Sequence, residues 1–114
     1  FFLPRLTGPL KAFELCSTGR KVFMEEAVSI GLANKAVPQD RLDAEVEALA
    51  ELYTAAATQS IGIMKQVLNR SFSSSLEEVL QMEAEGQTAC GQTEDFAEGV
   101  MAFLAKRPAV FKGK

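Results

Sequence analysis

The feature that most constrains the fold is a series of apolar residues that recur every three or four positions between residues 42 and 56. Leu42, Val46, Leu49, Tyr53 and Ala56 are separated by alternating steps of four and three. This spacing predicts an α-helix with one apolar stripe, because residues three and four apart share a helix face. Such a helix gains most of its stability from tertiary packing, so the stripe needs a surface to pack against.

The rest of the sequence repeats this design in shorter segments. Gly31 is expected to end a helix in the left-handed conformation, and Ser60 is expected to cap the start of a later one. Ser74 or Ser75 opens a further helix as part of a capping box. Residues 32–37 precede a proline and are expected to be extended or to form a short strand. The pattern predicts an all-α fold with helices over residues 3–6, 10–17, 25–30, 40–56, 60–72, 76–90 and 95–108.

Composition and charge narrow the classes of function. The sequence has 114 residues, enough for one domain with a modest core. Twelve Lys and Arg against fifteen Asp and Glu give a net charge of −3, whereas a nucleic-acid-binding protein normally carries a basic face. No apolar run approaches the roughly 20 residues that a membrane span needs.

Several catalytic groups are missing from the residue inventory. There is no His, no zinc-type spacing of Cys and no Gly-rich phosphate loop, so the sequence offers no histidine base and no recognisable metal-ligand pattern. Cys16 and Cys90 lie in apolar helical patterns, and we interpret them as buried free thiols rather than as a disulfide.

Four segments carry a resemblance to a known family. Residues 3–8 (LPRLTG) are followed by KAFEL at residues 11–15 and TGR at residues 18–20. Residues 25–38 continue the likeness with GLANKAVP at their end, and residues 95–107 match a terminal D-x-x-E-G-x-x-A-F-x-x-K-R block. Any one of these motifs alone would be weak, but together, in this order, they resemble the enoyl-CoA hydratase/isomerase (crotonase) family along the whole sequence.

The resemblance implies a protein that processes acyl-CoA thioesters. Members of the family bind the thioester carbonyl in an oxyanion hole of two backbone N–H groups and move protons with carboxylates. These groups lie in an N-terminal ββα-repeat core, ahead of the position where this sequence begins. Residues 1–114 therefore resemble the C-terminal helical, trimer-forming region of a crotonase-like fold, without catalytic residues, and the isolated chain is expected to be inactive.

The resemblance also implies properties of the complete protein. It would be an enoyl-CoA hydratase or isomerase that assembles as a trimer or hexamer. From the net charge and the lack of a long apolar run, we expect it to bind neither nucleic acid nor membranes. Coenzyme A would be part of its acyl-CoA substrate, with no tightly bound cofactor and no metal. The protein would be soluble and intracellular, located in the cytoplasm or, in a eukaryote, in a mitochondrion or peroxisome.

Phe103 and Lys106 are the candidate binding residues, and their spacing of three positions is expected to place both side chains on one helix face. In the family, the corresponding aromatic and lysine approach the adenine end of coenzyme A, often in the site of a neighbouring subunit. An aromatic ring can cover a purine, and an ammonium group meets a phosphate as a point charge. The alternative is that Phe103 belongs to the core and Lys106 is a solvated charge. A second aromatic that some relatives place one helix earlier is Gln87 here, which departs from the family pattern.

The acidic pair of the last helix and the apolar stripes each allow a simpler interpretation. Asp95 and Glu98 are read as an N-terminal capping arrangement of the last helix rather than as an acid/base pair. The rival to the family-based function is a stand-alone helical interaction domain without enzymatic activity, which the apolar stripes would serve equally well.

Overall fold

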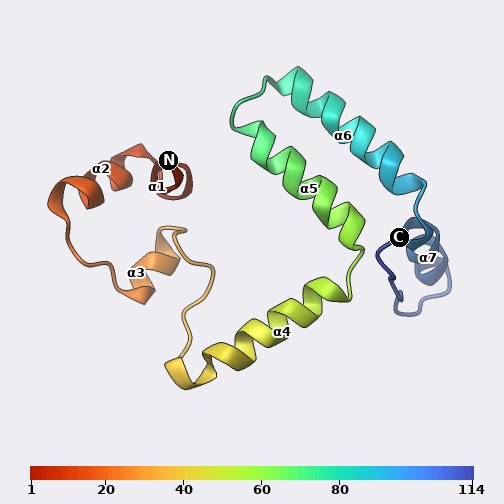
Figure 1. Ribbon diagram of the computed structural model, residues 1–114, viewed down its shortest axis with the longest axis horizontal. Helices are drawn as coiled ribbons and strands as arrows, with labels where there is room; N and C mark the ends of the chain where they lie inside the picture. Colours follow the sequence, from red (N-terminus) through yellow and green to blue (C-terminus); the bar gives the residue numbers. More distant parts are fainter. The chain divides into compact units, whose positions relative to one another are not determined.

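The computed structural model describes residues 1–114 and consists of helices and their connections, as the spacing of apolar residues predicts (Figure 1). No helix has the length and apolar character needed to cross a membrane. The chain divides into two compact units, Phe1–Glu45 and Val46–Lys114. The helices are α1 (Phe2–Thr7), α2 (Pro9–Thr18), α3 (Met24–Ser29), α4 (Leu42–Thr54), α5 (Thr58–Ser71), α6 (Leu76–Gly91) and α7 (Glu94–Leu104), with a short 3-10 helix at Gln39–Arg41.

Glycines follow the ends of α2 and α3, and the one after α3, Gly31, is the helix end that the sequence predicts. α2 is followed by Gly19, whose φ is 59° and whose N–H donates to the carbonyl of Leu15. After α3, Gly31 has a φ of 76°. The Gly31 N–H donates to the carbonyl of Val28 and the Leu32 N–H donates to that of Ala27. This pair of hydrogen bonds is a Schellman motif, which glycine favours because the left-handed conformation is strained for residues with a Cβ.

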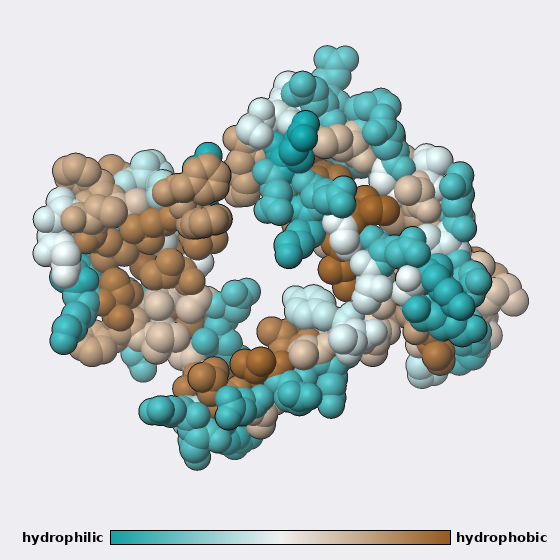
Figure 2. Space-filling view, in the orientation of Figure 1, coloured by the Kyte–Doolittle hydropathy of each residue, from teal (hydrophilic) through white to brown (hydrophobic).

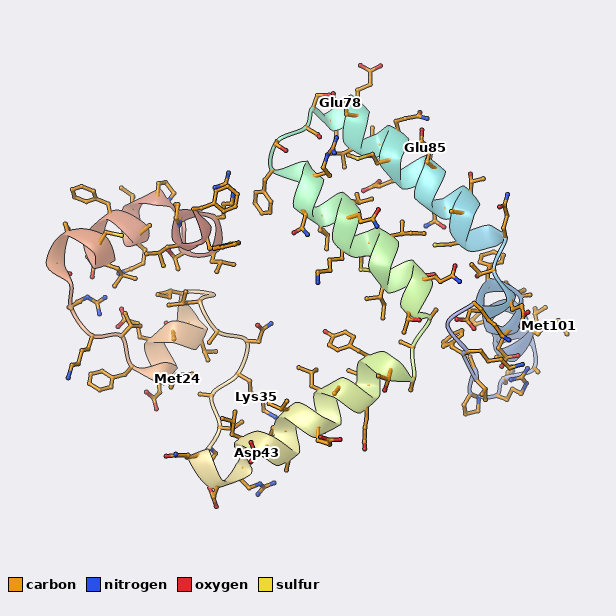
Figure 3. All side chains as sticks on the ribbon, in the orientation of Figure 1. Met24, Lys35, Asp43, Glu78, Glu85 and Met101 are labelled. Carbon is orange, nitrogen blue, oxygen red and sulfur yellow. The ribbon has the colours of Figure 1, made fainter.

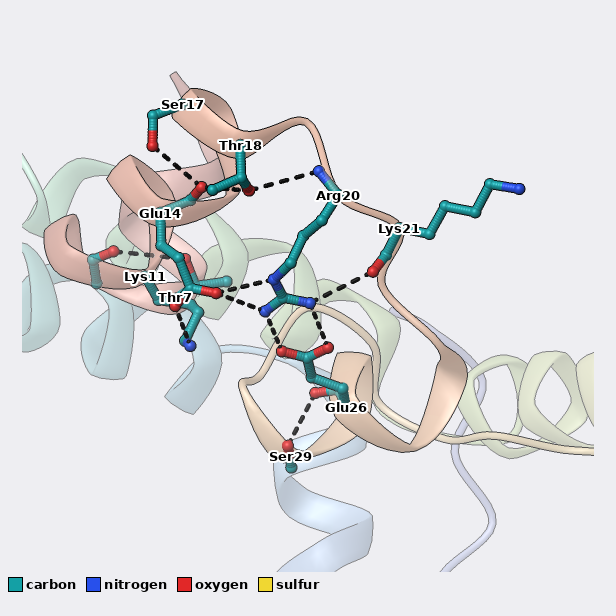
Figure 4. Close-up of polar contacts among 10 residues, drawn as sticks. Thr7, Lys11, Glu14, Ser17, Thr18, Arg20, Lys21, Glu26 and Ser29 are labelled. Atoms are coloured by element: carbon teal, nitrogen blue, oxygen red, sulfur yellow. Dashed lines mark hydrogen bonds and ion pairs between the residues drawn. The ribbon is translucent and has the colours of Figure 1, made fainter.

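An ion cluster joins α2 to α3 (Figure 4). Arg20 follows α2 and donates to both carboxylate oxygens of Glu26 on α3, and its Nε donates to Glu14 on α2 over 2.8 Å. Lys11 donates to the same Glu14 over 2.6 Å. The hydrogen bonds from Lys11 and Arg20 lower the pKa of Glu14, and those from Arg20 lower the pKa of Glu26. Both carboxylates therefore keep their charge, and with it the link between the helices.

α5 and α6 lie side by side in the second unit (Figure 1). Ser75 opens α6 with a complete capping box: its hydroxyl accepts from the Glu78 N–H, and the Glu78 carboxylate accepts from the Ser75 N–H. Figure 3 shows Glu78 at this end of α6 and Glu85 further along the helix. The helices approach closely at Gly86, where a Cβ would lie only 2.7 Å from Cγ2 of Ile63. Because the hydrogen bonds of the capping box join Ser75 to Glu78, Ser75 and not Ser74 is the cap of α6.

Four local predictions are wrong. Ser60 does not cap α5, because that helix begins at Thr58 after Ala57, with no side-chain cap. Of the two alternatives for residues 32–37, the short strand does not form, since no second strand is present to pair with it. The helix predicted from residue 40 begins as a 3-10 turn and continues as α4 only from Leu42 to Thr54. Cys16 is exposed and Cys90 half-buried, although both are free thiols as expected.

The apolar stripe of α4 is present but uncovered. Leu42, Val46, Leu49 and Tyr53 each keep 50–57% of their surface exposed, and α4 has no buried residue. Figure 2 shows hydrophobic side chains gathered along one side of α4 and over the α1–α3 region. The buried hydrophobic residues are few and mostly small: Ala12, Leu15, Ala27 and Ala102. Extensive exposed apolar surface of this kind is typical of interaction sites, which agrees with the need of each stripe for a packing partner.

Candidate functional site

The candidate site lies on α7 and the segment that follows it. Thr93 caps α7, since its hydroxyl accepts from the N–H of Phe96 over 3.0 Å. The expected capping role of Asp95 and Glu98 is therefore wrong, because a threonine two residues earlier already satisfies the helix start. Both carboxylates instead bind residues 107–113, beyond the end of the helix.

Asp95 is the buried anchor of this C-terminal segment, with only 3% of its surface exposed. Its carboxylate accepts from the N–H groups of Lys112 and Gly113 over 2.7 and 2.8 Å. Its own N–H donates to the carbonyl of Lys114 over 3.0 Å. Gly113 also approaches the start of α5, where a Cβ would lie 2.5 Å from the hydroxyl of Thr58. The end of the chain is thus tied to α5 and α7 by contacts that require a glycine.

Glu98 is the second anchor and is held by a guanidinium fork. Nη1 and Nη2 of Arg107 donate to its two oxygens over 2.6 and 2.8 Å, and the Val110 N–H donates over 2.8 Å. The hydrogen bonds from Arg107, followed by the one from Val110, lower the pKa of Glu98 to about 2, while Glu98 raises the pKa of Arg107. The pair therefore stays charged at any physiological pH.

Phe103 projects from the last turn of α7 and keeps 83% of its surface exposed. It lines a shallow apolar groove of about 400 Å³ together with Phe96, Val100, Leu104 and Phe111. Within this chain Phe103 is therefore not a core residue. An exposed aromatic beside an apolar groove has the shape and chemistry to cover a flat ring.

Lys106 lies beyond α7, so the helical spacing that would align it with Phe103 does not hold. α7 ends at Leu104. Lys106 has a φ of 51° and is the only residue with a Cβ whose φ is positive. Its N–H donates to the carbonyl of Phe103 over 3.2 Å, and the Arg107 N–H donates to that of Ala102 over 3.0 Å. These bonds form a Schellman motif with lysine at the position that usually holds glycine. The two candidate residues are linked through this turn, not by a shared helix face.

A second groove, of about 600 Å³, runs between α5 and α6. It is lined mainly by apolar residues, among them Met64, Leu68 and Leu80, but Glu83 and Gln87 also face it. These two polar residues interrupt the apolar stripe of α6 in the sequence, and their position at an open groove accounts for the interruption. No group of three or more His, Cys, Asp or Glu side chains comes together to hold a metal ion.

The sequence analysis missed the partners of Asp95 and Glu98. A signal was present, because Thr93 precedes the acidic pair and is itself a favoured cap residue. With the helix start satisfied by Thr93, Asp95 and Glu98 are free to bind the segment that returns after the helix. Which residues of that segment they bind depends on the path of the chain after Lys106, which no local spacing gives.

Comparison with known proteins places the chain in a family. The family model for enoyl-CoA hydratase/isomerase matches residues 1–114. The chain is 32% identical over 114 residues to the 1,2-epoxyphenylacetyl-CoA isomerase of Escherichia coli. It is 34% identical over 112 residues to the crotonyl-CoA hydratase of Syntrophomonas wolfei. The matches cover 100% and 98% of the chain but only 44% and 43% of these relatives, so the chain spans less than half of their length.

Solved structures agree with this assignment. The enoyl-CoA hydratase of Bacillus anthracis superposes with a TM-score of 0.90 at 32% identity, over 98% of the chain and 43% of that structure. The enoyl-CoA hydratase/isomerase of Cupriavidus metallidurans gives a TM-score of 0.92 at 30% identity, over 99% and 43%. The all-helical chain thus corresponds to part of the crotonase fold. We conclude that it belongs to the enoyl-CoA hydratase/isomerase family.

Proposed function

We propose that this chain is the helical C-terminal region of an acyl-CoA-processing enzyme, and that it supplies part of the coenzyme A site and an oligomerisation surface but no catalytic group. The two relatives named above act on different acyl groups by different reactions, yet both names specify a CoA thioester. The chain resembles both to a similar degree. A region similar to both enzymes is therefore better suited to bind the CoA part that their substrates share than the acyl part in which they differ.

The observation that carries the proposal is the exposed Phe103 beside the apolar groove of α7, with an unpaired lysine in the next turn. Lys106 forms none of the ion pairs of the chain. In this proposal the Phe103 ring covers the adenine and the Lys106 ammonium group faces a phosphate. An apolar ring and an unpaired cation three residues apart in the chain match the two chemical ends of an adenosine phosphate.

The proposal is tested by CoA binding to the complete protein. Lys106→Ala should weaken CoA binding by about 1 kcal/mol or less, since an exposed charge pair contributes little, and added salt should shrink the effect. Lys65→Ala is the matched control, because Lys65 is an exposed lysine on α5 that lines neither groove. Equal CoA affinities for wild type and both variants, at unchanged melting temperature, would mean that Lys106 is only a solvated charge.

Phe103→Ala is a cleaner test than the sequence suggests. A fully buried Phe would cost about 3–5 kcal/mol of stability when truncated, but Phe103 is 83% exposed within this chain. Truncation should therefore leave the melting temperature of the isolated chain nearly unchanged and lower the CoA affinity of the complete protein. A large loss of stability in the isolated chain would assign Phe103 to packing.

The second candidate function is a stand-alone helical interaction domain, which the uncovered stripe of α4 favours. Both functions predict that the isolated chain self-associates at about tens of micromolar, a range typical of weak interfaces. Only the first function predicts CoA binding by the complete protein that depends on Lys106. Light scattering from a compact monomer would contradict the shared prediction, and weaker CoA binding by Lys106→Ala than by wild type would reject the second candidate.

A further inference from the structure

The turn that holds Lys106 lies between two hydrogen-bonded elements. On one side, the last carbonyls of α7 accept from the N–H groups of Lys106 and Arg107. On the other, Glu98 accepts from both Nη atoms of Arg107 and from the Val110 N–H. The backbone on either side of Lys106 is thus fixed to α7, and the residue between has little freedom to change its conformation.

The conformation of Lys106 is the unexpected feature of this turn. A φ of 51° is strained for a residue with a Cβ, and glycine would fill the same position without strain. Strained backbone persists only where the surrounding structure enforces it, and it is concentrated at functional sites. Arg107, the next residue, is held at two points: its N–H donates to the carbonyl of Ala102, and its guanidinium group donates to both oxygens of Glu98.

Glu98 and Arg107 also affect the charge near Lys106. Since both oxygens of Glu98 are bound by Arg107, this carboxylate is not available to pair with Lys106. Without Arg107, Glu98 would keep only the hydrogen bond from the Val110 N–H, and its negative charge would have no ion-pair partner in the same stretch of chain as Lys106. The pair therefore both fixes the turn and leaves the Lys106 ammonium group unpaired.

We infer that Glu98 and Arg107 are positioning residues for Lys106, and that their ion pair holds the lysine where it binds the phosphate that CoA has and dephospho-CoA lacks. The inference rests on the proposed function of Lys106 as a CoA contact. It adds that the Glu98–Arg107 ion pair, and not the lysine charge alone, sets the preference for CoA over dephospho-CoA.

The positioning role of the Glu98–Arg107 pair is tested in the complete protein by a double-mutant cycle. Affinities for CoA and dephospho-CoA are measured for wild type, Glu98→Gln, Lys106→Ala and the double variant, well below their melting temperatures. Lys106→Ala should reduce the preference for CoA about three- to fivefold. Glu98→Gln should reduce it about two- to fivefold, and the double variant should lose no more than Lys106→Ala alone.

A matched control separates positioning from stability. Glu78 is also a carboxylate that accepts backbone N–H bonds, in the capping box of α6, and it does not line either groove. Glu78→Gln should lower the melting temperature and leave the preference for CoA unchanged. If Glu98→Gln does not fold, Arg107→Lys replaces it, because it keeps the charge but loses the fork; a reduced preference is again expected.

The outcomes distinguish the inference from the proposed function. A preference unchanged by Lys106→Ala would overturn both. A preference reduced by Lys106→Ala but unchanged by Glu98→Gln would overturn only the positioning role. If the double variant showed a smaller preference for CoA than Lys106→Ala, Glu98 would act independently of the lysine. If neither Glu98→Gln nor Arg107→Lys folded, the pair would be needed for stability. Either result also overturns the inference.

Discussion

Gly86 in α6 should be intolerant of a single methyl group, in contrast to Gly62 in α5. A Cβ at Gly86 would lie 2.7 Å from Cγ2 of Ile63, about 0.7 Å closer than the 3.4 Å at which ordinary contact begins. A Cβ at Gly62 would meet nothing within 4 Å. Because Cγ2 is attached directly to the β-carbon of a β-branched residue, it cannot move aside without a change of rotamer or backbone.

The magnitudes follow from two opposing effects. Gly→Ala within a helix is favourable by about 1 kcal/mol, and overpacking of a close contact costs about 1–3 kcal/mol. Gly62→Ala should therefore raise the free energy of unfolding by about 1 kcal/mol. Gly86→Ala should leave it unchanged or lower it by up to about 2 kcal/mol.

The assay is denaturant unfolding followed by far-ultraviolet circular dichroism, with both variants and the wild type at one protein concentration. The concentration must be fixed because self-association would change the apparent stability. If Gly86→Ala stabilised the chain as much as Gly62→Ala, the close approach of α5 and α6 at this point would be refuted. The unequal response of two helical glycines is thus a direct measure of α5–α6 packing.

Three further predictions concern the C-terminal segment and the activity. The pKa of Glu98 is about 2 in the folded chain against an ordinary 4.5, so its contribution to stability is complete above pH 4.5 and is lost as the pH falls towards 2. Glu98→Gln should therefore make the melting temperature depend less on pH between about 2 and 4.5. A pH profile of the melting temperature that the substitution leaves unaltered would contradict the ion pair. Lys106→Gly should stabilise the chain by about 1 kcal/mol through relief of the left-handed conformation, whereas Lys106→Ala should not; equal melting temperatures for the two variants would argue against strain. The isolated chain should neither hydrate nor isomerise enoyl-CoA thioesters, and turnover above buffer that disappears on mutation of one of its Glu residues would refute the absence of catalytic groups.

The sequence by itself determined the helices and most of their ends. The left-handed cap at Gly31 and the capping box of Ser75 with Glu78 form as predicted, because each depends on residues within one turn of each other. The family was also readable from the ordered motifs of residues 3–38 and 95–107. Local hydrogen bonding and side-chain periodicity are enough for these conclusions.

The tertiary structure decided what the acidic residues of α7 do and how Lys106 is held. Asp95 binds Gly113 across 18 positions and Glu98 binds Val110 across 12, and no periodicity links residues so far apart. The turn at Lys106 is left-handed, against the intrinsic preference of a residue with a Cβ, and it lies between α7 and the segment that these contacts hold. A local pattern specifies which face of a helix is apolar, but only the folded path of the chain determines which groups lie opposite that face.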